Sequence, residues 1–298
     1  MNGLRQRLRK VFSLVKFSYI VVVINVFLKY VGLGYPMYEH GNIGSKGYFF
    51  AGNEISALLI VLVSIIAYNY WLTGKKRAYF LFFVLNLVVG ITISSKTGIL
   101  GILLIFFLIP LRRPSMTISL KRLRSILLSV FLILPVVLIV AWQVVKTSAI
   151  YSRLIYFWDR LDVLTFVLSN RNVFLKNAYA TYKTEYSMVE KAIGVGQSRY
   201  ELLNDGKIVE IDVADIFFAY GFIGLFLFVL LIGLLLHRAL KLSRHKSYDY
   251  ARYVLLMTVV LLTISTIAGH VFSSGMAGIY IGLLFSLMYV QKNETPRN

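Results

Sequence analysis

Residues 193–224 read IGVGQSRYELLNDGKIVEIDVADIFFAYGFIG, and the rest of the chain is organised around this stretch. It begins with a glycine turn, continues through a polar segment of mixed charge, and enters a long apolar run through EIDVAD. Its polar part belongs to a longer segment, residues 146–215, which holds nine basic and nine acidic residues. Apolar runs and short basic connectors make up the remainder, so we expect any chemistry to be located in residues 146–215.

The composition indicates a membrane protein. Of the 298 residues, 58% are hydrophobic and only 15% are charged, and the mean hydropathy is +0.73. These values are too apolar for a soluble domain of this length. The chain has no cysteine, which excludes disulfides and thiolate metal sites. Its four histidines do not have metal-ligand spacing, so neither a metal nor another cofactor is predicted. They are His40, His237, His245 and His270.

Apolar runs of spanning length predict an all-α integral membrane protein with about eight transmembrane helices. No repeat or linker divides the chain, so residues 1–298 are interpreted as a single polytopic membrane domain. A cleaved signal peptide is the alternative for the first run, but no small-residue cleavage pattern follows that run. The expected spans are residues 15–35, 55–72, 79–94, 99–111, 126–145, 216–236, 253–268 and 276–290.

The Lys and Arg residues predict the orientation. Five connectors and tails carry 19 of them, against two acidic residues, and all five fall on one side of an eight-span topology. Both termini are therefore expected in the cytoplasm, with residues 146–215 as a large extracytoplasmic loop between spans five and six. The net charge of +19 is explained by topology and by attraction to anionic lipid, without nucleic acid as a partner. The basic segments are residues 1–10, 74–77, 112–124, 237–252 and 291–298.

The extracytoplasmic loop has recognisable parts. Residues 153–168 and 171–186 have the pattern of amphipathic helices that lie on a membrane surface, where aromatic side chains more often anchor than bind a ligand. The glycines of residues 193–196 permit a sharp turn. Asp212 and Asp215 then stand three residues apart at the mouth of a span, on one face of a helix. Because charges facing lipid are costly, these two carboxylates and that of Glu210 are expected to face an aqueous cavity or a cationic partner.

Six motifs follow one another along the chain: GYFFAGNEISA (47–57), ISSKTGILGILL (93–104), SNRNVFLKNA (169–178), IGVG (193–196), EIDVADIFFAYGFIG (210–224) and AGHVFSSGMAG (268–278). This ordered set resembles the O-antigen ligase and polymerase superfamily, and within it the Wzy-type polymerases of surface polysaccharides. The order and the topological side of the motifs agree with that family from about Gly47 onward. Members usually have ten or more spans, so the chain is expected to be a shortened member, a fragment of a longer reading frame, or a member that needs a partner.

The resemblance implies a membrane glycosyltransferase of the GT-C type, working without a metal. It would polymerise oligosaccharide repeat units linked to undecaprenyl pyrophosphate on the extracytoplasmic face of the bacterial plasma (inner) membrane, as in the synthesis of capsule or exopolysaccharide. Its partners would be the lipid-linked oligosaccharide, membrane lipids, a flippase and a chain-length regulator. The alternatives are a ligase that moves finished glycan to another acceptor, a transporter of lipid-linked sugars, and a structural or sensory membrane protein. A transporter is disfavoured because the sequence shows no internal repeat.

The same chemistry explains the candidate cations. A pyrophosphate leaving group needs positive charge to stabilise the negative charge that develops on it. The resemblance assigns this role to Arg171 and to Lys96, which stands where the family usually has an arginine and which lacks a bidentate fork. Arg199 is the third candidate. The alternative for Arg171 is an arginine that binds lipid headgroups, and the alternative for Lys96 is a lysine that reaches to the interface.

The attacking hydroxyl needs a base or an orienting acceptor. Asp212 and Asp215 are the candidate carboxylates, as an acidic pair resembles the polymerase branch, whereas the ligase branch tends to have a histidine in this region. Glu210 is a candidate for acceptor binding or a charge at the rim. His270 is of a residue type that transfers protons near neutral pH, although a histidine at a helix end more often caps the helix.

Overall fold

The computed structural model describes residues 2–39, 42–49, 52–111, 162–245 and 247–291. Throughout these residues the secondary structure is helical, apart from two isolated antiparallel bridges in the connector after the first helix. This confirms the predicted fold class, an all-α membrane protein.

The bundle is built from long apolar helices. Within the described residues, five helical segments are long and apolar enough to cross a membrane, and Lys96–Pro110 and Gly275–Tyr289 are shorter apolar helices. The expected span at residues 126–145 lies outside the described residues, so the count of eight stays a prediction. The elements are α1 (Asn2–Phe27), η1 (Leu28–Val31), α2 (Gly52–Leu72), α3 (Lys76–Ile93), α4 (Lys96–Leu111), α11 (Asp212–Ser243), α12 (Asp249–Ala268), α13 (Gly275–Ser286) and η2 (Leu287–Tyr289).

Two expected spans have different bounds. The first helix begins at Asn2, well before residue 15, and its helical course ends at Val31, where Gly32 adopts a left-handed conformation (φ 79°). Helix α11 begins at Asp212 and continues to Ser243, beyond both expected ends of the sixth span. Hydropathy missed these ends because the terminal turns of both helices carry polar and charged residues.

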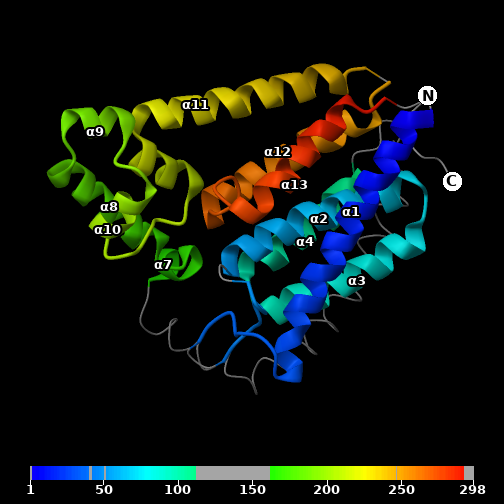
Figure 1. The fold of residues 1–298 in the computed structure, drawn as a ribbon, viewed down its shortest axis with the longest axis horizontal. Coiled ribbons are helices and arrows are strands. Elements are labelled where there is room, and N and C mark those ends of the chain that lie inside the picture. The colour runs from blue at the N-terminus through cyan, green and yellow to red at the C-terminus, as the bar shows by residue number, and fades with distance from the viewer. Residues whose placement is uncertain (1, 40–41, 50–51, 112–161, 246, 292–298) are drawn as a thin grey trace.

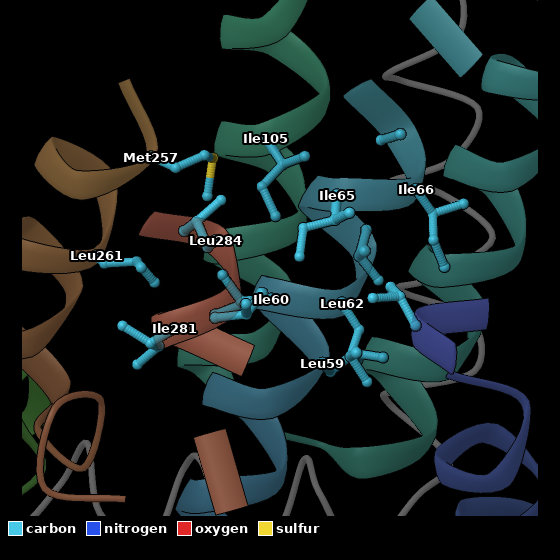
Figure 2. Close-up of a cluster of buried hydrophobic side chains, with 14 of the residues drawn as sticks. Leu59, Ile60, Leu62, Ile65, Ile66, Ile105, Met257, Leu261, Ile281 and Leu284 are labelled. Carbon is cyan, nitrogen blue, oxygen red and sulfur yellow. The ribbon is translucent and has the colours of Figure 1, made fainter. Parts of the chain in front are cut away.

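Helix α2 lies at the centre of the bundle and packs against α1, α3, α4 and α13 (Figure 1). Its buried side chains meet those of α4, α12 and α13 in one apolar core (Figure 2). Gly101 of α4 allows a close approach to α2, since a Cβ there would lie 2.3 Å from Cδ1 of Ile60. A helix surrounded on its sides by other helices gives the bundle a rigid axis.

The two ends of the bundle differ. Figure 1 shows the start of α1 at one end and helices α7 (Val163–Leu168), α8 (Arg171–Glu185), α9 (Met188–Ile193) and α10 (Gln197–Leu203) at the other. The described part of the segment 146–215 therefore lies opposite the start of α1, and the orientation in the membrane stays a prediction. The expected helix at 171–186 is confirmed as α8, whereas the expected helix at 153–168 lies mostly outside the described residues.

Helices α8 to α10 and the first turns of α11 form a small unit with its own core, here called the outer unit. Tyrosine rings make up much of this core, which is separate from the core around α2. Its buried residues are Ala178, Tyr182, Tyr186, Tyr200, Val209, Phe218 and Ala219.

A break in α11 joins the outer unit to the membrane helices. Gly221 has φ 66° and ψ −166°, which interrupts the helix. The nearby carbonyl of Phe218 accepts a hydrogen bond from the Tyr186 hydroxyl (3.1 Å), and that of Ala219 accepts one from the Gly196 amide (2.8 Å). The expected glycine turn at 193–196 is confirmed, because Gly194 also has a positive φ of 83°. The outer unit thus supplies the hydrogen bonds that satisfy the broken helix.

Candidate active site

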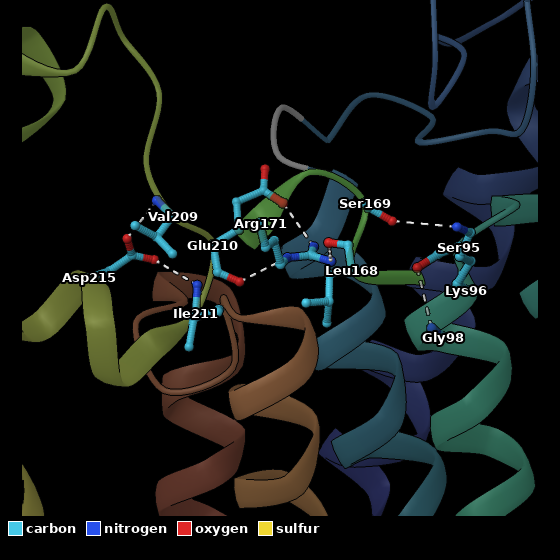
Figure 3. Close-up of polar contacts among 10 residues, drawn as sticks. All are labelled: Ser95, Lys96, Gly98, Leu168, Ser169, Arg171, Val209, Glu210, Ile211 and Asp215. Carbon is cyan, nitrogen blue, oxygen red and sulfur yellow. Dashed lines mark hydrogen bonds and ion pairs between the residues drawn. The ribbon is translucent and has the colours of Figure 1, made fainter. Parts of the chain in front are cut away.

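Arg171 is the centre of the candidate site. Two left-handed residues, Ser169 (φ 55°) and Asn170 (φ 69°), turn the chain immediately before it at the start of α8. Its Nε donates to the carbonyl oxygen of Glu210 (3.0 Å) and its Nη2 to Oε2 of the same residue (2.8 Å) (Figure 3). Nη1 makes a longer contact with the carbonyl of Leu168 (3.4 Å). Only 9% of the side chain is exposed, so a nearly buried cation is held by a carboxylate.

Glu210 supplies the other half of this ion pair. It has a left-handed backbone (φ 61°), and a Cβ on Gly269 would lie 2.2 Å from its carbonyl oxygen. The turn after α12 therefore packs directly on the Glu210 backbone. The Glu210 side chain is 32% exposed, whereas Asp212 is fully buried and Asp215 is 5% exposed. Of these three carboxylates, Glu210 is the one that solvent or a substrate reaches.

Lys96 approaches the same turn from the other side. It is the first residue of α4, and its Nζ lies 3.5 Å from Oγ of Ser169 (Figure 3). Ser169 is two residues before Arg171, so the two cations flank one short turn. The structure thus brings together Lys96 and Arg171, which the sequence places far apart.

Asp215 fastens the segment that carries Glu210. Its Oδ1 accepts hydrogen bonds from the Tyr200 hydroxyl (2.8 Å) and the Val209 amide (2.9 Å), and its Oδ2 accepts one from the Ile211 amide (3.1 Å). The amides on both sides of Glu210 therefore bind one buried carboxylate. Asp215 fixes the left-handed conformation that presents Glu210 to Arg171.

Asp212 fastens a different segment, the turn between α12 and α13. Its Oδ2 accepts the amides of Val271 (3.0 Å) and Phe272 (2.9 Å), and its Oδ1 accepts the hydroxyl of Ser273 (2.7 Å). Although Asp212 and Asp215 are one turn apart, they hold separate partners. The expectation that they face an aqueous cavity or a cation is wrong, because backbone amides and hydroxyl groups satisfy both carboxylates inside the protein.

His270 lies in the turn that Asp212 holds. It is partly exposed, has φ 53°, and is within electrostatic reach of Asp215. Its neighbour Gly269 contacts the backbone of Glu210, so the turn brings His270 to the same end of the protein as the Arg171–Glu210 pair.

Arg199 belongs to another contact. It forms an ion pair with Glu190 of α9, and its side chain is 55% exposed. The Glu190 carboxylate also accepts the amide and hydroxyl of Ser187 in a capping box (2.8 Å each). The hydrogen bond from the Ser187 amide, then that from its hydroxyl, and then the charge of Arg199 lower the pKa of Glu190. Arg199 thus links α9 to α10, and the structure does not join it to the Arg171–Glu210 pair.

Left-handed backbone conformations concentrate near the candidate site. Such conformations cost a non-glycine residue on the order of 1 kcal/mol or more, and they cluster where function requires an unusual geometry. Seven described non-glycine residues have a positive φ, and five of them belong to the turns around Arg171, Lys96 and Glu210. These five are Ser94, Ser169, Asn170, Glu210 and His270.

Two residues that support the site, Tyr200 and Glu54, are not among the candidates that the sequence predicts. Tyr200 donates to Asp215 from the core of the outer unit, where burial and then the Asp215 charge raise its pKa, so its hydroxyl stays protonated. Glu54 of α2 accepts the Ser274 hydroxyl (2.6 Å) and so holds the α12–α13 turn from the other side. Glu54 stands in the first of the six motifs, which was the only signal available for it.

Within the described ranges, no three His, Cys, Asp or Glu side chains lie close enough to hold a metal ion together.

Comparison with known proteins relates one part of the chain to a family. The family model described as O-antigen ligase like membrane protein matches residues 158–294. That region includes Arg171, Glu210 and His270, whereas Lys96 lies before it. No curated protein and no solved structure matches the chain. Over residues 158–294, the chain is similar to the O-antigen ligase like family of membrane proteins, which supports a role in membrane glycan transfer in general.

Proposed function

We propose that the protein is a membrane glycosyltransferase that polymerises oligosaccharide repeat units carried on undecaprenyl pyrophosphate. The observation that carries the proposal is the Arg171–Glu210 pair, a nearly buried guanidinium beside a partly exposed carboxylate, at the end of the bundle opposite the start of α1. The basic connectors support the bacterial plasma membrane as the location, with the termini in the cytoplasm and the pair outside. A flippase that delivers the donor and a chain-length regulator are the protein partners that this function implies.

We assign Arg171 and Lys96 to binding the diphosphate of the lipid-linked donor. The guanidinium fork of Arg171 suits two oxygens of a diphosphate, and Lys96, across the Ser169 turn, adds a point charge. Without a donor bound, the Glu210 carboxylate accepts a hydrogen bond from Nη2 of Arg171. Binding of a diphosphate would therefore replace this carboxylate with another anion at the guanidinium. This exchange frees the Glu210 carboxylate next to the bound donor.

The transfer step then needs one base. The hydroxyl oxygen of the acceptor repeat unit bonds to the anomeric carbon of the donor glycan, and the bond from that carbon to the diphosphate oxygen breaks. Undecaprenyl pyrophosphate leaves with the bonding electrons, stabilised by Arg171 and Lys96. We assign Glu210 to take the hydroxyl proton, since it is the most exposed of the three carboxylates. His270, in the adjoining turn, is the second group to which the proton can pass.

Asp212 and Asp215 receive a positioning role in this proposal. Each of them accepts three hydrogen bonds inside the protein, so neither offers a free oxygen to a substrate hydroxyl without breaking a buried bond. Asp215 presents Glu210, and Asp212 holds the turn that carries His270.

The test is the length distribution of surface glycan and of lipid-linked intermediates in cells that lack the gene. Complementation with the wild-type gene should restore long chains, whereas Arg171→Ala should leave single repeat units on the carrier at an unchanged protein level. Arg199→Ala is the matched control, because it removes an equal charge from an exposed pair, and it should restore normal lengths. Full-length polymer that accumulates on the carrier would indicate a ligase instead. A normal profile with Arg171→Ala would remove Arg171 from the site.

A further inference from the structure

We infer that α9 is a membrane anchor, with its apolar side chains inserted among lipid acyl chains at the outer boundary of the bilayer. Three of its six residues are large, apolar and strongly exposed: Met188 by 84%, Val189 by 66% and Ile193 by 58%. With 100° per residue, these three side chains lie within an arc of about 140°. Glu190 and Lys191 lie on the opposite side of the helix. A compact apolar surface of this kind marks a contact with something apolar.

The position of the break in α11 places α9 at the membrane boundary. The 22 residues from Phe222 to Ser243 extend about 33 Å as a helix, close to the roughly 30 Å thickness of the hydrocarbon core. Basic residues at Arg238, Lys241 and Arg244 lie toward the far boundary, where the long side chain of Arg238 stacks on Tyr289, so Gly221 lies near the other boundary. A Cβ on Gly221 would lie 2.5 Å from both the carbonyl oxygen of Ala192 and the amide nitrogen of Gly194. The C-terminal end of α9 is therefore fixed at the level where α11 enters the bilayer.

The apolar surface of α9 continues into a surface that already faces lipid. Directly after the break, Phe222 is 60% exposed, Ile223 52% and Phe226 64%, on a helix that crosses the membrane. Because the backbones of α9 and α11 touch at this break, the C-terminal end of α9 lies next to the start of this lipid-facing surface. This continuity favours lipid over a second protein as the partner of α9.

Lysines near α9 agree with an interfacial position. Nζ of Lys183 lies 4.5 Å from the ring centroid of Tyr179, and Nζ of Lys191 lies 5.5 Å from that of Tyr182. Lysine and tyrosine are the side chains that membrane proteins use at the level of the headgroups. The anchor would fix the height of the outer unit, and with it the height of Arg171, relative to the headgroups. That consequence rests on the proposed function, whereas the anchor itself does not.

The absence of cysteine makes a direct test simple, because each single-cysteine variant carries one label. Met188→Cys, Val189→Cys and Ile193→Cys would each be labelled with a nitroxide and reconstituted as single copies in phospholipid nanodiscs. Electron paramagnetic resonance then compares collisions with oxygen, which concentrates in the bilayer, and with a water-soluble nickel chelate. Phe226→Cys on α11 is the lipid control, and Lys207→Cys, in the exposed turn after α10, is the water control.

The expected result is that labels at Met188 and Val189 resemble the lipid control, with high oxygen and low nickel accessibility. Accessibility to nickel equal to that of the Lys207→Cys label would overturn the proposal. Shielding from both reagents would overturn it as well, because the label would then lie against protein. Three separate α9 positions keep the test valid if one variant fails to fold. None of these readouts uses glycan transfer, so the anchor and the proposed function succeed or fail separately.

Discussion

Asp212 at the start of α11 holds Ser273 of the turn between α12 and α13, with 2.7 Å between the Asp212 Oδ1 and the Ser273 Oγ. The next serine, Ser274, donates to Glu54 of α2. Two carboxylates from different helices thus hold two adjacent serines of one turn. His270 lies in this turn, so its position depends on both helices.

Asp212→Ala should destabilise the protein strongly. It removes three hydrogen bonds and leaves the buried amide of Val271 without this acceptor, which should lower the free energy of unfolding by roughly 2–5 kcal/mol. Ser273→Ala removes one donor from this buried carboxylate and should cost less, about 1–3 kcal/mol. Denaturant unfolding of the purified variants measures both. An Asp212→Ala protein as stable as the wild type but unable to extend glycan would instead assign Asp212 to the chemistry.

Glu210→Gln removes the negative charge of the side chain but should leave the fold intact. The amide keeps an acceptor for Arg171 but cannot take a proton, so the protein should fold while chain extension falls by about 100-fold or more. The same change removes the anion that competes for the guanidinium, so inorganic pyrophosphate should bind more tightly than to the wild type. Calorimetric titration in detergent and an assay of glycan length measure the two effects.

Glu201→Gln is the control for Glu210→Gln, since it removes the same charge from a carboxylate that contacts Gln197 within α10. It should leave chain length and pyrophosphate binding unchanged. Unaltered pyrophosphate affinity in Glu210→Gln would contradict the exchange of anions at Arg171.

Much of this architecture can be predicted from sequence because it depends on local pattern. Apolar runs predict the membrane helices, and IGVG predicts the sharp turn. These signals come from neighbouring residues and from the cost of placing charge or broken backbone in lipid.

The partners of the site residues could not be predicted, because tertiary packing decides them. Nothing near Asp212 in the sequence indicates that it accepts amides from Val271 and Phe272. The sequence alone therefore suggests a pair of aspartates facing water or a cation. It suggests only a lesser role for Glu210, since the contact of Glu210 with Arg171 depends on a left-handed conformation that the sequence does not show.

Glu190 should make the stability of the outer unit depend on acid pH. Its pKa is lower in the folded protein than in the unfolded chain, so its contribution to stability is present above the ordinary glutamate pKa of about 4.3. That contribution is lost as the pH falls through the lowered pKa, when the carboxylate gains a proton. Thermal unfolding at pH 6 and pH 3 should show a larger loss of stability in the wild type than in Glu190→Gln. An equal loss in both proteins would show that the capping box adds no pH dependence.

The contact between Gly194 and α11 should tolerate no side chain. A Cβ at Gly194 would lie 2.2 Å from the carbonyl oxygen of Ala219, and the positive φ adds strain, so Gly194→Ala should cost roughly 3 kcal/mol or more. Gly196→Ala has the same sign of φ with no atom within 4 Å, so it should cost only about 1–2 kcal/mol. Gly233→Ala, on an open face of α11, should stabilise the helix by up to about 1 kcal/mol.

Limited proteolysis and denaturant unfolding of these three alanine variants measure how firmly the outer unit is attached. Cleavage between α8 and α11 should accelerate in Gly194→Ala, because the carbonyls of Phe218 and Ala219 lose the hydrogen bonds that Tyr186 and Gly196 supply. The Gly196→Ala variant should be cleaved at an intermediate rate and Gly233→Ala at the wild-type rate. Equal rates for Gly194→Ala and Gly196→Ala would mean that backbone strain alone matters at this turn. The close contact with α11 would then not be what secures the outer unit.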